Sequence, residues 1–425
     1  MMLTRRAFVA GASAAWAAAA APAAYKLSRE EDAFLDDLQH RSFRFFWEQA
    51  NPDTGLVRDR ALADSETPDV RPWASSAATG FGLAALCIAA ERGWSSKAEA
   101  RARALNTLRY FHDRAFQEHG WFYHFVDSAT GERRNKTEVS DIDTALLLAG
   151  IVTAQEFFAG DGEMERLAKG IWDRMDFRWM QNGNPLLLNM HWKPEDGFSK
   201  NYWDHHCEHG IMYLLGIASA TKPLPPDSWY AWRRPEVTYA GHTYISGAPP
   251  LFVHQYSQAW IDFRNHPEKR GQKTNWFVNS VEATRAHRQF CIDLNAQFPG
   301  CYSDNVWGIT ASDTAHGYKA WGGPPATKNI DGSVVPCAAG GSLMIAPEIC
   351  LPALMEMKRK FGDRIYKRYG FVDALHPVNG WTGPDVIGID VGITMLSAEN
   401  LRTGKVWKWF MKNRRVQRAM GEIFA

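Results

Sequence analysis

The sequence predicts an all-α protein in which antiparallel helix pairs close into a ring. Long apolar stretches with helical spacing recur along the 425 residues. Each follows a loop in which aromatic and acidic residues gather, and no Gly/Ser-rich or charged linker divides the chain. An open helical solenoid is the alternative, but the sequence has no repeat of fixed period to support it.

The individual helices follow from the spacing of apolar residues. Residues 29–49 carry an amphipathic pattern, which ends at the turn-forming residues 51–55. Residues 75–91 predict a helix buried on most sides, because most of them are small or apolar. Either Ser140 or Asp141 fits the N-cap of the apolar helix that follows. The other predicted helices lie in residues 96–118, 162–178, 202–219, 337–361 and 388–415, and residues 237–245 are an isolated β candidate.

Charge and composition limit the kinds of partner. Lys and Arg number 48 against 47 Asp and Glu, so the net charge is +1 and no basic excess points to nucleic acid or acidic lipid. The chain has 18 Trp, 13 Tyr and 23 Phe. Tryptophans scattered through polar, Gly-rich stretches are typical of the walls of a ligand groove.

The N-terminus has the pattern of an export signal. Residues 4–9 contain a twin-arginine pair, a small-residue apolar run covers residues 10–21, and an Ala-Pro-Ala sequence supplies a cleavage site. We predict that residues 1–24 are a twin-arginine signal, and that the mature residues 25–425 form a single monomeric domain in the periplasm or outside the cell. A membrane-anchored N-terminal helix is the alternative, although the run is short for a span and no later segment offers ~20 unbroken apolar residues.

Acidic residues stand directly before two strongly apolar helices. If the helices that follow Glu138 and Glu208 are neighbours in the ring, the two acids face one cleft. Glycoside hydrolysis needs such a pair, with one acid to protonate the leaving oxygen and one carboxylate to activate water or attack. The alternative is a pair of helix caps or salt-bridged structural acids. Asp141 and Asp143 are more ambiguous, because at least one of them is expected to cap the helix.

Metal and thiol chemistry receives less support. The six cysteines include no C-x-x-C pair, and a bridge between Cys291 and Cys301 is left undecided. His205, Glu208 and His209 have the H-x-x-E-H order, which on a helix could hold zinc with the glutamate as base. A third protein ligand is not evident and the segment starts in a loop, so we predict no metal site and no cofactor.

Two further segments have the composition of a site for neutral sugars, which bind by stacking on aromatic rings and through directional hydrogen bonds. Residues 252–264 interleave polar and aromatic side chains with apolar ones, although Asp262 and Arg264 could equally form a structural pair. Residues 302–313 form a long loop with a Trp. The sequence has no P-loop, no strand-borne G-x-G-x-x-G and no G-x-S-x-G elbow, which disfavours nucleotide chemistry and serine hydrolysis.

At these segments the chain resembles the bacterial glycoamylase-like (glucoamylase-like) family, which includes β-1,2-glucanases. The resemblance covers almost the whole chain after the signal, in residues 43–48, 55–60, 78–83, 142–147, 253–256, 305–313, 387–390 and 399–404. It implies an (α/α)6 toroid, a central carbohydrate groove, and hydrolysis of β-1,2-linked glucan.

The resemblance also implies catalytic residues. The family's acid in its Y-N-E segment falls on Glu208, and its E-x-S-x-x-D-T pattern falls on Glu138 and Asp143. The chain departs from the family in residues 204–207, Asp-His-His-Cys, where similar sequences usually carry Tyr and Asn just before the glutamate. Because these residues precede Glu208, the subsite next to Glu208 is expected to differ from that of the family, and the linkage of the substrate depends on this subsite.

We therefore expect an exported glycoside hydrolase that cleaves a β-glucan, in the first place β-1,2-glucan, and takes an oligo- or polysaccharide substrate. Glu208 is expected to act as acid or base, with Glu138 or Asp143 as its partner. A zinc metallopeptidase and a non-catalytic glycan-binding protein on the same toroid are the alternatives. The residues expected to bind the substrate are Arg60, Trp203, His254, Tyr256, Trp260, Asp262, Arg264, Asp304, Trp307 and Asp390.

Overall fold

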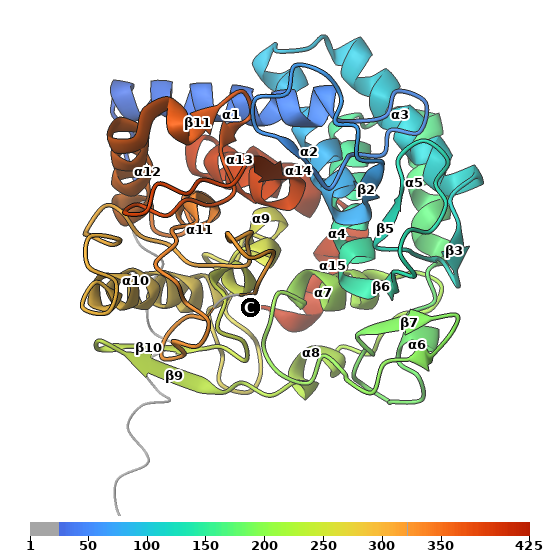
Figure 1. Cartoon of the computed structure of the whole chain (residues 1–425). Helices are drawn as coiled ribbons and strands as arrows, with labels where there is room; N and C mark the ends of the chain where they lie inside the picture. The colour runs from blue at the N-terminus through green and yellow to red at the C-terminus, as the bar shows by residue number, and fades with distance from the viewer. Residues whose placement is uncertain (1–24, 321) are drawn as a thin grey trace, which may run out of the picture.

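The computed structural model describes residues 25–320 and 322–425, and most of its regular structure is helical (Figure 1). The predicted export signal, residues 1–24, lies outside the described residues. Within the described ranges, every helix falls short of the length or the apolar content needed to cross a membrane.

An inner layer consists of helices that bury almost all of their side chains. They are α2 (Ser76–Arg92), α4 (Asp141–Phe157), α7 (Gly210–Ala218), α9 (Tyr256–Trp260), α11 (Pro336–Gly340) and α13 (Gly388–Arg402). α2 packs against α4 and α13, α4 against α7, α7 against α9, and α9 against α13, so these contacts form a closed circuit. Because the helices are covered on all sides, their sequences are apolar without a strong amphipathic pattern.

Helices with one apolar face cover this layer, and most of them lie toward the rim of the molecule in Figure 1. They include α1 (Arg29–Glu48), α3 (Lys97–Asp113), α5 (Gly162–Arg174), α10 (Trp276–Leu294), α12 (Pro347–Phe361) and α15 (Arg414–Ile423). α1 packs on α2 and α13, α3 on α2, α5 on α4, α12 on α11, and α15 on α7. Their apolar stripes face the inner helices. Periodicity identified α1, α3, α5 and α12 in the sequence, whereas α10 was not predicted and α15 was not separated from the helix predicted over residues 388–415. The shorter helices are α6 (Phe177–Met180), α8 (Ser228–Ala231), α14 (Lys405–Met411) and the 3₁₀ helices η1 (Leu251–His254) and η2 (Gly362–Arg364).

Two predicted helix boundaries can be compared with the structure. Ser140 is the N-cap of α4, because its hydroxyl accepts the Asp143 N–H. Of the two candidates for this cap, Ser140 is therefore confirmed, and Asp141 is the first residue of the helix. The helix predicted over residues 96–118 ends earlier, at Asp113. The chain then forms a short hairpin of β3 (Gln117–Glu118) and β4 (Trp121–Phe122).

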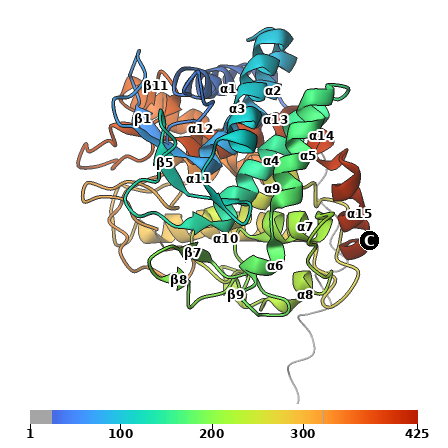
Figure 2. The same ribbon diagram turned by 90° about the vertical axis from the view of Figure 1, so that its right-hand side faces the viewer.

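Short antiparallel strands tie together the loops at the N-terminal ends of inner helices. Three of them, β2 (Trp73–Ser75), β6 (Val139–Ser140) and β13 (Asp385–Ile387), run directly into α2, α4 and α13, so the side chains at these junctions come from distant parts of the sequence. Figure 2 shows β1 and β5 on one side of the molecule and α14, α15 and the C-terminus on the other. The pairs are β1 (Arg60–Leu62) with β13 (Asp385–Ile387), β2 (Trp73–Ser75) with β5 (Phe125–Asp127), β6 (Val139–Ser140) with β7 (His191–Lys193), β7 with β8 (Gly197–Phe198), β9 (Glu236–Tyr239) with β10 (His242–Ile245), and β11 (Tyr366–Lys367) with β12 (Gly370–Phe371).

Glycines allow α2 and α4 to touch through their backbones. A Cβ atom on Gly80 would lie 2.3 Å from the Leu146 carbonyl oxygen, and one on Gly150 would lie 2.1 Å from the Gly80 carbonyl oxygen. Any larger residue would therefore push the two helices apart. This contact fixes the position of the first turn of α4 relative to α2.

All six cysteines lie within the described residues and are free thiols. Cys291 and Cys301 are both buried and do not form the bridge that the sequence left undecided. Burial raises the pKa of the Cys291 thiol to about 12, so this thiol is protonated and unreactive at neutral pH.

Candidate active site

A cavity of about 730 Å³ lies where the loops meet the N-terminal ends of α2, α4, α7 and α13. Its volume falls within the range of small-molecule sites. Among the residues predicted for the site, Glu208, Asp143, Tyr256 and Arg60 line it. The full lining is Asp59, Arg60, Arg71, Trp73, Ser75, His124, Phe125, Ile142, Asp143, Leu146, Glu208, Phe252, Tyr256, Ala311, Tyr318, Ile387 and Ile389.

Glu208 stands just before α7 and is buried at the cavity wall. The Cys207 thiol donates a hydrogen bond to its carboxyl Oε2, and the Ser257 hydroxyl donates to its backbone carbonyl over 2.7 Å. Burial raises the pKa of Glu208, and the negative charge of Asp143 raises it further. A carboxyl group in such surroundings keeps its proton to higher pH, which suits a proton donor.

Asp143 lies in the first turn of α4 with both carboxyl oxygens engaged. The Ser140 hydroxyl donates to Oδ2 over 2.5 Å, and the imidazole Nε2 of His124 lies 3.5 Å from Oδ1. Ser140 also accepts the Asp143 N–H over 3.3 Å. Because the helix N-terminus carries a partial positive charge, it attracts the carboxylate. Asp143 therefore presents a fixed carboxyl group to the cavity that Glu208 also lines.

Glu138 lies behind His124 and is not one of the residues that line the cavity. Its Oε1 is 3.0 Å from His124 Nδ1, and its Oε2 accepts a hydrogen bond of 3.3 Å from the Thr137 hydroxyl. The hydrogen bond with His124 is the main reason that the pKa of Glu138 falls to about 2. The structure thus brings Asp143, rather than Glu138, to the same cavity as Glu208.

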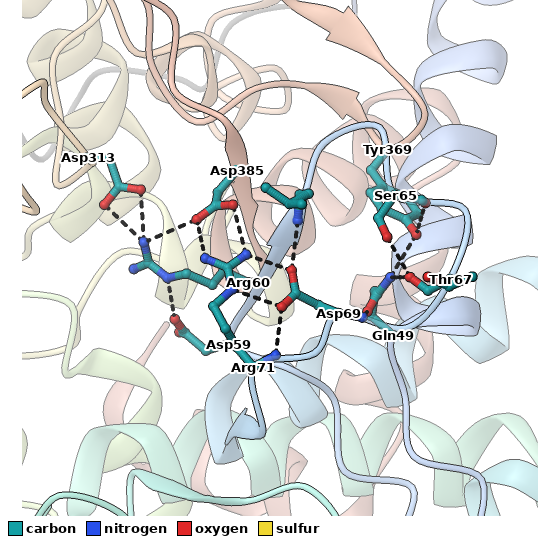
Figure 3. Close-up of polar contacts among 11 residues, drawn as sticks. Gln49, Asp59, Arg60, Ser65, Thr67, Asp69, Arg71, Asp313, Tyr369 and Asp385 are labelled. Atoms are coloured by element: carbon teal, nitrogen blue, oxygen red, sulfur yellow. Dashed lines mark hydrogen bonds and ion pairs between the residues drawn. The ribbon is translucent and has the colours of Figure 1, made fainter.

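Ion pairs hold the loops around the cavity together, as Figure 3 shows. The Arg60 guanidinium contacts Asp59 at 3.0 Å, Asp313 at 2.8 Å and Asp385 at 3.8 Å. Arg71 contacts the same Asp385 at 2.7 Å. Burial would lower the pKa of Arg60, but the two aspartates nearest to it raise the pKa well above its usual value. Arg60 therefore lines the cavity with a guanidinium that already has carboxylate partners.

Asp390, predicted to bind substrate, is buried in the first turn of α13 below this network. It shares a hydrogen bond with Asp373, whose Oδ2 accepts the Asp313 N–H over 2.6 Å. Burial raises the pKa of Asp390 to about 6 and raises that of Asp373 strongly. The two carboxyl groups lie beside a separate internal cavity of about 20 Å³, which is the volume of a single water molecule rather than of a sugar.

The remaining predicted site residues do not line the large cavity. Trp203, Trp260 and Trp307 are buried in the core, where the Trp203 Nε1–H donates to Asp141 over 2.8 Å. His254 borders an internal cavity of about 30 Å³. Asp262 and Arg264 form the structural pair that was the alternative explanation, with Nη2–Oδ2 at 2.7 Å, and Asp304 is exposed and paired with Arg288 at 3.3 Å.

Sequence reasoning missed several residues of the cavity wall, above all His124, Trp73, Phe125, Phe252 and Tyr318. Trp73 lies three residues before the start of α2, at the kind of loop-to-helix junction that predicted Glu208. The junction pattern could therefore have identified Trp73, had it been applied to aromatic residues as well as to acids. Phe125 lies 16 residues before α4 and is opposite Ser75 in the pairing of β5 with β2, so no local pattern marks it.

The geometry does not match the zinc peptidase alternative. α7 begins at Gly210, so His205 and His209 precede the helix and are not one turn apart on it. His205 Nδ1 pairs with Asp204 at 2.6 Å, whereas His209 is fully buried. In residues 25–320 and 322–425, no group of three or more His, Cys, Asp or Glu side chains is placed to hold a metal ion.

Comparison with known proteins assigns the chain to a class. The glycoamylase family model, described as "Putative glucoamylase", matches residues 200–414, just over half of the chain. The protein therefore belongs to the glycoamylase family.

Three relatives define the comparison more closely. The crystal structure of a putative glucoamylase from Bacteroides uniformis is 28% identical, with a TM-score of 0.84 over 94% of this chain and 98% of that one. The endo-β-1,2-glucanase from Chitinophaga pinensis, solved with sophorotriose and glucose, is 26% identical, with a TM-score of 0.83 over 94% and 99% of the two chains. The exo β-1,2-glucooligosaccharide sophorohydrolase (non-reducing end) from Parabacteroides distasonis is 27% identical over 92% of this chain, which spans 58% of that protein's length.

Proposed function

We propose that the protein is a glycoside hydrolase that cleaves β-1,2-linked glucan. The observation that carries the proposal is the cavity of about 730 Å³, whose wall carries the carboxyl groups of Glu208 and Asp143 as well as that of Asp59, which is paired with Arg60. Two carboxyl groups facing one sugar-sized space are what glycosidic hydrolysis requires. The linkage is inferred from the relatives from Chitinophaga pinensis and Parabacteroides distasonis, whose names specify β-1,2-glucan or its oligosaccharides.

The two carboxyl groups have different surroundings, which suggests different roles. Glu208, with its raised pKa, is the proposed general acid that protonates the glycosidic oxygen as the bond to the anomeric carbon breaks. Asp143, held by Ser140 and His124, is the proposed carboxylate partner. In this proposal Glu138 acts through His124 and does not contact the substrate.

Aromatic rings around the acids provide surfaces on which sugar rings can stack. Trp73, Phe125, Phe252, Tyr256 and Tyr318 line the cavity, and Trp73 and Tyr318 are also among the large exposed side chains of the protein. The exposed pair marks the side from which a glucan chain enters. Of the aromatic residues predicted from the sequence, Tyr256 takes this role.

We also propose that the inner and outer helices form an (α/α)6 toroid, supported by the closed circuit of inner helix contacts and the likeness to the Chitinophaga pinensis enzyme. The proposed location is the periplasm or the exterior, reached through the twin-arginine signal of residues 1–24. Cell fractionation of the producing bacterium, compared with an Arg5→Lys, Arg6→Lys variant, tests the location.

Glu208→Gln is the direct test of the proposed function. Purified protein is incubated with β-1,2-glucan, and with laminarin and starch as controls for linkage. Wild type should release oligosaccharides from β-1,2-glucan, and the variant should be slower by about 10²–10⁴-fold, because its amide is too weak an acid to protonate the leaving oxygen. Glu282→Gln removes a carboxylate that pairs with His242 on the outer surface and should retain wild-type turnover.

Two results would contradict the proposal. Folded wild-type protein that releases no oligosaccharide from any glucan would show that it is not a hydrolase of this class, and binding without turnover would identify a glycan-binding protein instead. Unchanged turnover in Glu208→Gln would show that Glu208 is not the general acid.

A further inference from the structure

His124 stands between two carboxylates at the cavity wall. Its Nδ1 is 3.0 Å from Glu138 Oε1, and its Nε2 is 3.5 Å from Asp143 Oδ1. Its backbone is also fixed, because its N–H donates to the Glu138 carbonyl over 3.0 Å and its carbonyl accepts the Ser76 N–H over 3.1 Å. The imidazole therefore has one position, with a carboxylate at each nitrogen.

This arrangement determines the protonation of the imidazole. Nδ1 is within hydrogen-bond distance of Glu138, whereas the 3.5 Å between Nε2 and Asp143 Oδ1 is an ion-pair contact. A neutral imidazole has no charge with which to attract this second carboxylate, whereas an imidazolium pairs with both. The negatively charged groups that act on the ring are Asp143 from α4, Glu138 from the segment before β6, and Asp59 from the segment before β1. Burial would lower the pKa of His124, but these charges outweigh it and raise the pKa to about 9.

We propose that His124 is a positioning residue of the hydrolase, an imidazolium that Glu138 orients and that holds the Asp143 carboxylate aimed into the cavity shared with Glu208. This inference rests on the proposed function. Each oxygen of Asp143 then has one fixed partner, His124 at Oδ1 and Ser140 at Oδ2. Glu138 serves the reaction indirectly, by holding the ring.

The proposal differs from a purely structural role in what it predicts for the kinetic constants. A residue that only tied β5 to the segment before β6 would change stability and leave the turnover of the folded protein unchanged. A residue that aims a reacting carboxylate also affects kcat, with little change in KM, because the interaction it supports is needed in the transition state.

The kinetic experiment compares His124→Gln, Glu138→Gln and wild type on the glucan that wild type cleaves. His124→Gln keeps a hydrogen-bond donor but loses the charge, and we expect kcat to fall by about 10²-fold, the scale expected when a reacting group is misplaced. KM should change little, and Glu138→Gln should lower kcat by less. His242→Gln is the matched control. His242 pairs with Glu282 at 2.7 Å, this pair lies outside the cavity, and the variant should keep the wild-type kcat and KM.

A second measurement does not depend on activity. NMR of ¹⁵N-histidine-labelled protein, with the His124 signal assigned by its loss in His124→Gln, should show both ring nitrogens protonated at neutral pH. In Glu138→Gln and Asp143→Asn the ring should titrate at lower pH than in wild type.

The outcomes separate the two proposals. A protein that cleaves no glucan but has a doubly protonated His124 would contradict the proposed function alone. A neutral His124 at pH 7, or a His124→Gln variant with unchanged kcat, would overturn the role of His124. If His124→Gln fails to fold, the kcat of Glu138→Gln decides the question, and the His124 signal is assigned as the one that both Glu138→Gln and Asp143→Asn displace.

Discussion

Replacing Gly80 with alanine should destabilise the protein although alanine is the better helix former. Gly80 lies in the interior of α2, where the substitution alone would stabilise by roughly 0.5–1 kcal/mol. The new Cβ, however, would lie 2.3 Å from the Leu146 carbonyl oxygen on α4. Since real Cβ contacts essentially never fall under 3.0 Å, the two backbones must separate by at least 0.7 Å, the difference between these two distances.

The magnitude follows from what surrounds this contact. The obstructing atoms belong to the backbone, so no side-chain rotation relieves them. α2 and α4 are both buried, and moving them disturbs the packing on α7 and α13 as well. Overpacking of a core costs about 1–3 kcal/mol, which exceeds the gain in helix propensity. The shift also moves Asp143, at the N-terminal end of α4, so kcat should fall together with stability.

The assay is chemical denaturation followed by circular dichroism, with Gly421→Ala as the matched control. Gly421 lies inside α15, and a Cβ there would meet nothing within 4 Å. Gly421→Ala should therefore raise the denaturation midpoint, whereas Gly80→Ala lowers it. If both variants are equally stabilised, the inferred backbone contact between α2 and α4 is wrong.

Two further predictions concern acid stability and the substrate. Burial lowers the pKa of His209, His254 and His287 from 6.5 to about 3, so as the pH falls below 6.5 the unfolded chain takes up protons that the native chain does not. The free energy of unfolding should then decrease by up to about 1.4 kcal/mol per pH unit for each histidine down to about pH 3, and urea titrations between pH 7 and 4 that show no loss would contradict this. Trp73→Ala should raise KM about tenfold, equivalent to about 1.4 kcal/mol, with little change in kcat, because its ring lines the cavity. Phe116→Ala, an exposed residue outside the cavity, should leave KM unchanged, and an equal rise in both variants would exclude a stacking role for Trp73.

Helices were predictable because their burial leaves a local record in the sequence. α1 has one apolar face and α2 is apolar almost throughout, and both patterns can be recognised within a single segment. The β candidate at residues 237–245 is likewise local, and it forms the hairpin of β9 and β10. The formation of these helices and of this hairpin depends on residues only a few positions apart in the sequence.

The candidate site was only partly predictable because its contacts are not local. Glu208 and Asp143 could be identified, since an acid beside a buried helix needs a partner or a use. Trp203 and Trp260 were expected in the cavity but lie in the core, since an indole ring suits either place and the sequence does not record which way it points.

Charged partners illustrate the same limit. Arg60 was expected to bind substrate. In the structure its guanidinium is already paired with Asp313, which is 253 positions away in the sequence. His124 gave no signal at all, because its importance depends on the simultaneous proximity of a carboxylate to each ring nitrogen. Spacing in the sequence does not reveal such a coincidence.

The pairing of β1 with β13 has a consequence for biosynthesis. One wall of the cavity combines residues 59–73, made early in translation, with residues 385–389, made near the end. Until α13 leaves the ribosome, the apolar surface of α2 that it covers stays exposed to other nascent chains. The cavity is thus among the last parts of the molecule to be completed, and slow formation of this long-range pairing should make the nascent chain depend on chaperones.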